Sequence, residues 1–99
     1  MVRHIVAWNF ADGFSDAENA ENAVLIKQQL QELAALIDGI IEIKVYIEPM
    51  PDSNRAVVLS SLFESVEAFN AYKTHPEHVR VGKLVRASTK DRVCFDSFE

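Results

Sequence analysis

The pattern of apolar and polar positions predicts strands over three stretches, residues 2–10, 40–48 and 55–63. The first and third stretches are apolar on both faces, which is typical of strands that are covered on both sides. The middle stretch alternates cleanly, so it is expected to be half exposed. Its inward positions are expected to be Ile41, Ile43, Val45 and Ile47.

A helical period replaces the alternation after the first strand. Ser15 and Glu18 form a capping box, which predicts the start of a helix, and Gly39 occupies the position expected just past its end. The helix is therefore expected to run to about Ile37. Its apolar stripe consists of Ala23, Ile26, Leu30, Leu33, Ala34 and Ile37.

The second half of the chain predicts two short helices and a last strand. Ser65 can cap a helix in which Val66, Phe69 and Tyr72 recur at helical spacing. The chain then breaks at His75, and Pro76 suits the first position of a further short helix. A final strand is expected to carry Val93, Phe95 and Phe98.

This order, β-α-β-β-α-β, predicts an α+β domain of the ferredoxin-like type over residues 1–99. Such a sandwich has one four-stranded antiparallel sheet with its helices on one face. Because two strands are apolar on both faces, the uncovered face is expected to meet a second copy of the chain, which would close a dimeric α/β barrel. A small-molecule pocket is accordingly expected on that open face.

Charge and cysteine content limit the partners and the compartment. The formal net charge is −5, and no basic run exceeds two residues, which argues against nucleic acid and against an anionic membrane surface. No apolar run reaches the roughly 18 residues that span a bilayer. The single cysteine, Cys94, excludes an intrachain disulfide and fits a reducing cytoplasm. Cys94 lies between Val93 and Phe95, so it is expected to be buried and inert.

Five segments, in this order and at this spacing, resemble the stress-responsive A/B barrel (Dabb) domain family. They are RHIVAWNF at 3–10, IDGI at 37–40, FESVEAFNAY at 63–72, HPEHV at 75–79, and the last strand with Asp96. The resemblance covers nearly the whole chain. It implies a ferredoxin-like subunit and a homodimer whose two sheets form a barrel.

The resemblance also implies candidate catalytic residues. Olivetolic acid cyclases, plant enzymes of this family, close a polyketide ring by intramolecular aldol condensation with no metal or organic cofactor. Similarity to them implies that His78 is the catalytic histidine and that Tyr72 and His4 support it. Their third-strand histidine is replaced here by Val57, and their helix-one tyrosine has no counterpart, so the resemblance does not extend to their substrate.

The residues themselves allow two interpretations of each candidate. A neutral imidazole at His78 can act as a general base, and the Tyr72 phenol can orient it or bind a substrate oxygen; alternatively, both pack the core. His4 lies on an apolar strand face, where it is either a satisfied core histidine or a polar group in an apolar pocket. His75 precedes Pro76 and is expected to be structural.

No metal or cofactor is expected. His75, Glu77 and His78 are close in sequence, but zinc needs three or four convergent ligands, and no second cluster is evident. The chain has none of the glycine-rich phosphate loops or the G-x-S-x-G motif, so nucleotide-binding and serine-hydrolase functions lack support.

Three functions therefore remain open for this chain. The first is cofactor-independent acid/base catalysis, of the aldol, cyclase or isomerase type, on a small apolar or aromatic carbonyl ligand. The second is a non-catalytic stress-response or ligand-binding protein. The presence of Val57, where the cyclases have a histidine, favours this function. The third is a cofactor-free monooxygenase acting on quinone-like aromatics, an activity known from folds of the same architecture.

Overall fold

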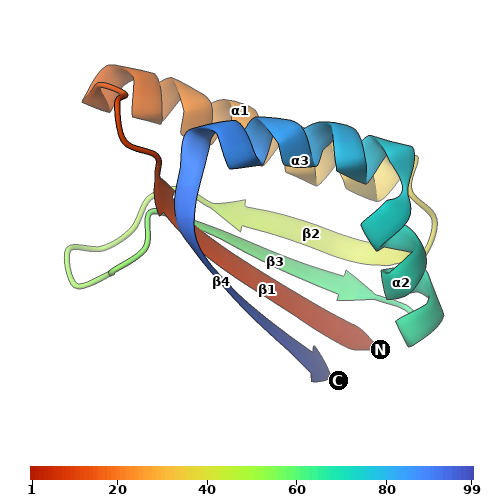
Figure 1. Cartoon of the computed structure of the whole chain (residues 1–99). Coiled ribbons are helices and arrows are strands. Elements are labelled where there is room, and N and C mark those ends of the chain that lie inside the picture. Colours follow the sequence, from red (N-terminus) through yellow and green to blue (C-terminus); the bar gives the residue numbers. More distant parts are fainter.

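Four antiparallel strands form one sheet, and three helices cover one of its faces (Figure 1). The computed structural model describes all residues 1–99. Its elements are β1 (Val2–Phe10), α1 (Asp16–Leu36), β2 (Ile40–Tyr46), β3 (Val57–Phe63), α2 (Val66–Thr74), α3 (Pro76–Ser88) and β4 (Thr89–Phe98). The strand order is β2-β3-β1-β4. The predicted ferredoxin-like α+β fold is confirmed.

Helix α1 begins and ends as its sequence predicts. The Ser15 hydroxyl accepts from the backbone N–H of Glu18, and the Glu18 carboxylate accepts from the N–H of Ser15. After the helix, Gly39 adopts a positive φ of 89°, and a Cβ built there would lie only 2.6 Å from the Cβ of Ala68. Only glycine fits this turn, which brings β2 close beneath α2. None of the helices combines the length and apolarity that crossing a bilayer requires.

The break between α2 and α3 is built by His75 and Pro76. The N–H of His75 donates to the carbonyl of Tyr72, and the Nδ1 atom of His75 accepts from the N–H of Glu77, so one residue ends α2 and caps α3. His75 is therefore structural, as predicted. Helix α3 then continues to Ser88, which makes it longer than the short helix that the sequence suggested.

The core lies between the sheet and the helices. From β1, the side chains of Val2, His4, Val6 and Trp8 are all buried on the face that the helices cover. Two inward predictions were wrong. A bulge between Ile40 and Glu42 shifts the register of β2, so Ile41 is exposed, and Ala34 lies on the outer side of α1.

The other face of the sheet has no helix on it (Figure 1). Its central strands contribute Ile5 and Val58, and its edge strands contribute large side chains that are about half exposed or more: Tyr46, Val93 and Phe95. Arg3, Glu42 and Lys44 also lie on this face, so its expected apolar character is confirmed only in part. In the register of β4, Phe98 pairs with Val2 and belongs to the opposite, helix-covered side.

Candidate active site

A cavity of about 270 Å³ lies on the helix-covered face of the sheet. The open face, where the pocket was expected, carries a second and more open hollow of about 540 Å³, lined by Ala7, Tyr46, Val58 and Val93 among others. The strand register places the predicted site residue of β1 at the first of these cavities. His4 pairs with Ser61, and both side chains are buried toward the helices, so His4 cannot reach the open face. The first cavity is lined by His4, Val6, Trp8, Leu30, Leu59, Tyr72, His78, Gly82, Val85, Arg86 and Arg92. All three predicted site residues are therefore brought together.

Tyr72 and His78 form the centre of this site. Their rings stack with centroids 4.0 Å apart and an interplanar angle of 30°. Tyr72 comes from the last turn of α2 and His78 from the first turn of α3. The turn at His75 folds the second helix back, which places the two rings face to face.

Hydrogen bonding determines which nitrogen of His78 is available. Its Nδ1 atom lies 3.1 Å from the carbonyl oxygen of Lys73. A carbonyl can only accept, so Nδ1 carries the proton and Nε2 of the neutral ring keeps its lone pair. Partial burial lowers the pKa of His78, and the nearby charges of His4 and Arg86 act in the same direction. His78 is thus a neutral imidazole at neutral pH, with Nε2 available as a base.

The Tyr72 hydroxyl has no partner. The side chain is 1% exposed, and its oxygen is buried without any hydrogen bond. Burial raises the pKa of Tyr72 to about 12, so the phenol stays protonated and acts as a donor. Buried polar groups almost always have a partner, so an unpaired hydroxyl at a cavity wall indicates a position where an acceptor binds.

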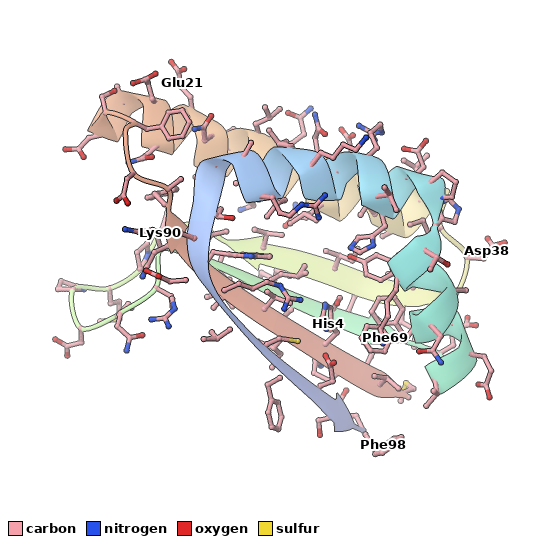
Figure 2. All side chains as sticks on the ribbon, viewed as in Figure 1. His4, Glu21, Asp38, Phe69, Lys90 and Phe98 are labelled. Atoms are coloured by element: carbon pink, nitrogen blue, oxygen red, sulfur yellow. The ribbon has the colours of Figure 1, made fainter.

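His4 is held by an acid that the sequence analysis did not single out. Its Nδ1 atom forms a short hydrogen bond with Asp96, which lies directly opposite it in the β1–β4 register. The other side of the ring packs against Phe69, with centroids 4.9 Å apart, as Figure 2 shows for the two labelled side chains. The His4 ring centroid is 6.4 Å from that of Tyr72. The sequence offered one sign of this pair, the aspartate near the end of the chain, Asp96. Only the strand register shows that it lies opposite His4.

Cys94 is exposed, and the expectation that it is buried was wrong. Strand β4 is an edge strand, and the helices do not cover Cys94 there, although it faces their side. Partial desolvation and the charge of Asp96 raise the pKa of the Cys94 thiol, so it is not an activated nucleophile.

Donor atoms of His4, Cys94 and Asp96 lie within 4.8 Å of one another. They are the donor set with which the chain could hold a metal ion. However, the Nδ1 atom of His4 is already engaged by Asp96, and the Arg92 guanidinium lies in hydrogen-bonding reach of the thiol, where it opposes a cation.

The histidines near the helix break form no such group. His75 accepts from the backbone of Glu77, His78 donates to the backbone of Lys73, and the Glu77 carboxylate pairs with Arg80 at 2.8 Å. Each side chain is therefore used locally.

Two arginines complete the cavity wall, and the sequence analysis missed both. Arg86 comes from α3 and Arg92 from the start of β4. Gly82 lies one helical turn before Arg86, and a Cβ there would come within 3.2 Å of the Arg86 Nη1 atom. Gly82 thus leaves space for the Arg86 side chain along the wall of the cavity. No charge pattern in the sequence distinguishes these arginines from surface ones.

The sequence from residue 2 to residue 99 matches the model of the stress-responsive A/B barrel domain family, Dabb. The chain belongs to this family. The match covers every residue of the candidate site, from His4 to Asp96. No curated protein matches the sequence.

Solved structures similar to this Dabb domain share its fold over nearly the whole chain. A dimeric protein of unknown function from Bacteroides fragilis is 30% identical, with a TM-score of 0.88, covering 97% of this chain and 93% of its own. An Arabidopsis thaliana protein is 22% identical, with a TM-score of 0.80 and coverage of 100% and 95%. A hydroxynitrile lyase from Passiflora edulis is 19% identical, with a TM-score of 0.80 and coverage of 97% and 90%. At these lower identities the likeness shows the fold alone.

The cavity of this Dabb domain combines a base, a donor and apolar walls. The base is Nε2 of His78, and the donor is the hydroxyl of Tyr72 stacked against it. At the third-strand position where olivetolic acid cyclases have a histidine, Val57 is fully buried in the core and adds no polar group. The arrangement can therefore accept one proton and stabilise one developing oxyanion.

Proposed function

We propose that this Dabb domain is a homodimer that binds a small carbonyl compound in the cavity and catalyses proton transfer at the carbon next to the carbonyl group, without a cofactor. The observation that carries the proposal is the unpaired, buried hydroxyl of Tyr72 beside a neutral His78. Together they suit a ligand that offers an acceptor oxygen and an acidic C–H bond.

The roles follow from the protonation states. Nε2 of His78 takes the proton from the α-carbon, the C–H electron pair forms a carbon–carbon double bond, and the C=O π pair moves onto oxygen to give an enolate. The Tyr72 hydroxyl donates a hydrogen bond to that oxygen as its charge develops. His78 can then return the proton to another carbon, which is an isomerisation, or the enolate can add to a second carbonyl group, which is an aldol closure. His4, oriented by Asp96, is the second polar group on the cavity wall.

The Passiflora protein has the same fold and is a hydroxynitrile lyase, an activity that involves proton transfer at a small carbonyl compound but no enolate. Its identity to this chain is too low to transfer the substrate. We therefore propose only that the fold can place a base in such a cavity, and that lyase or cyclase chemistry is a natural extension of enolate formation.

The homodimer is supported by the apolar open face of the sheet. Phe95 is 64% exposed there, next to Val93 and opposite Ile5 of β1. Similar structures from Bacteroides fragilis, Jannaschia and Thermobifida fusca are described as dimeric. A second copy of this face would cover these side chains and close a barrel.

We place the protein in the reducing cytoplasm because its single cysteine has no disulfide partner.

The proposal is tested by solvent exchange at carbon. Small ketones, aldehydes and keto acids are incubated with the protein in deuterated buffer, and loss of the α-proton signal is followed by proton NMR. We expect exchange with some of them, and its loss in His78→Gln, which keeps a side chain able to donate to the Lys73 carbonyl. His75→Asn is the matched control, since it replaces a histidine that only caps α3. Exchange that persists unchanged in His78→Gln would disprove the role of His78.

A non-catalytic ligand carrier is the second candidate, and the apolar Val57 favours it because one expected polar group is missing from the region of the site. The same experiment separates the two. Ligands that shift the signals of cavity residues, with no exchange for any of the compounds, would indicate a carrier.

A further inference from the structure

Two positive charges point to the chemistry of the ligand. Arg86 and Arg92 lie in the wall of the cavity that holds Tyr72 and His78. The five salt bridges of the chain use Arg3, Arg80, Lys90 and His4 as their basic partners, so neither cavity arginine is paired with a carboxylate. The chain has 15 acidic and 10 basic residues, so carboxylates are in excess. Seven of the ten Lys and Arg side chains lack a carboxylate partner, but only Arg86 and Arg92 lie in the wall of this cavity.

The two arginines come from different elements. Arg86 extends along α3 past Gly82, where an added Cβ would lie 3.2 Å from the Nη1 atom, so the glycine leaves space for this side chain. Arg92 is on β4, near the thiol of Cys94. The one carboxylate on this side of the sheet nearby, Asp96, is already bonded to His4. Arg86 and Arg92 are both exposed residues without a carboxylate partner, so they give this part of the cavity wall a positive charge.

We propose that Arg86 and Arg92 form an anion subsite, and that the ligand of the cavity is a small carbonyl compound that also carries a carboxylate group. This inference rests on the proposed function and narrows its substrate class to aliphatic or aromatic keto acids of similar size. A guanidinium group presents parallel N–H donors that match the two oxygens of a carboxylate. A cavity of about 270 Å³ accommodates one substituted ring or short chain.

An anion subsite formed by Arg86 and Arg92 also suits the proposed formation of an enolate. Enolate formation next to a carboxylate creates a second negative charge on the ligand, and a cationic wall stabilises it as it forms. Arg86 lies close enough to His78 for its charge to disfavour a protonated His78 in the empty site. A bound anion would offset that charge and allow His78 to hold the abstracted proton.

The test compares an acid with an uncharged molecule of the same shape. Benzoate and benzamide are titrated into 15N-labelled protein, and the indole N–H signal of Trp8 is followed. Trp8 is the only tryptophan and lines the cavity, so its single indole signal reports directly on occupancy. We expect benzoate to bind at least about tenfold more tightly than benzamide, and its affinity to fall as salt is added.

Matched variants assign the effect to the two arginines. Arg86→Gln and Arg92→Gln are each expected to weaken benzoate binding about tenfold and to leave benzamide binding unchanged. Arg80→Gln is the control, because Arg80 lies on the same helix but pairs with Glu77 outside the cavity. The amide spectrum of each variant shows that it is folded.

The possible failures are distinct. Equal affinity for benzoate and benzamide, no binding of either, or equal losses in Arg86→Gln and Arg80→Gln would overturn the anion subsite. None of these results bears on proton abstraction by His78, which the exchange experiment measures with uncharged ketones as well as keto acids. Exchange of uncharged ketones without preference for acids would support the proposed function and refute this inference.

Discussion

The rings of Tyr72 and His78 lie 4.0 Å apart although the two residues belong to different helices. Within one continuous helix, residues six positions apart would point in different directions, because only spacings of three, four and seven share a face. The cap at His75 and the proline after it interrupt the helix between them. The helix break is therefore what creates the stacked pair, and the pair is the centre of the candidate site.

Replacing Tyr72 by phenylalanine should separate a functional hydroxyl from a structural one. The hydroxyl is buried and unpaired, so its removal is expected to raise the free energy of unfolding by about 1 kcal/mol. The same variant should lose most of its catalysis of proton exchange. Tyr46→Phe, which alters an exposed hydroxyl on the open face, is the control for denaturant unfolding. A clear loss of stability in Tyr72→Phe would mean that the hydroxyl has a structural partner.

Asp96→Asn tests the positioning of His4. The neutral amide removes the charge that holds the Nδ1 proton of His4, so exchange activity is expected to fall about tenfold or more, mainly in kcat. The direct readout is the low-field NMR signal of that Nδ1 proton, which should be present in the wild type and absent in the variant. Asp91→Asn, on the same strand and bonded to Asn9, is the control. An unchanged signal in Asp96→Asn would show that Asp96 does not hold His4.

Most of the fold could be predicted from the sequence because its signals are local. The capping box at Ser15, the proline after His75 and the alternation in the strands each act within a few residues, and all three predicted the observed elements. The exposed position of Ile41 could not be predicted, because a bulge changes strand parity without a distinctive sequence.

The site was predicted only in part, because its geometry depends on contacts between distant segments. Periodicity placed His4 on a strand face but could not tell whether that face meets the helices or the open side. The bond between His4 and Asp96 joins residues 92 positions apart and depends on strand register. Arg86 and Arg92 lie on different elements, and only the packing of α3 over the sheet brings both to one cavity.

The turn at Gly39 should tolerate no side chain. Gly39→Ala combines a positive φ with a contact of 2.6 Å to the Cβ of Ala68, and it is expected to cost about 2–4 kcal/mol in the free energy of unfolding. Gly13 is the matched control, since it has a similar φ of 92° but open space around its Cα. Gly13→Ala should cost only about 1 kcal/mol. Equal costs for the two variants would show that the Ala68 contact is relieved by a small shift.

Phe95 should hold the proposed dimer together. Phe95→Glu places a charge in the apolar part of the open face, opposite Ile5, so light scattering should report a monomer that keeps its helical circular dichroism. Phe98→Glu provides the comparison, because Phe98 is on the same strand and more exposed but faces the other side of the sheet. It should leave the dimer intact. A wild-type monomer at micromolar concentration would refute the dimer itself.

The protonation of His78 also links the site to stability. Its pKa in the folded protein is lowered from the ordinary value of 6.5, so the unfolded chain binds this proton more readily than the folded one. The contribution of the neutral ring to stability is therefore present above about pH 6.5 and is lost as the pH falls below it. Between neutral and mildly acidic pH, the wild type should lose more stability than His78→Gln does.

The central claim is that His78 is a neutral base whose Nε2 atom is free to accept a proton. The most direct measurement is the 15N NMR titration of the His78 ring, assigned by comparison with His78→Gln. We predict an Nδ1–H tautomer at neutral pH, with Nε2 unprotonated and a titration midpoint below 6.5. An Nε2–H tautomer, or a midpoint above 6.5, would contradict the account.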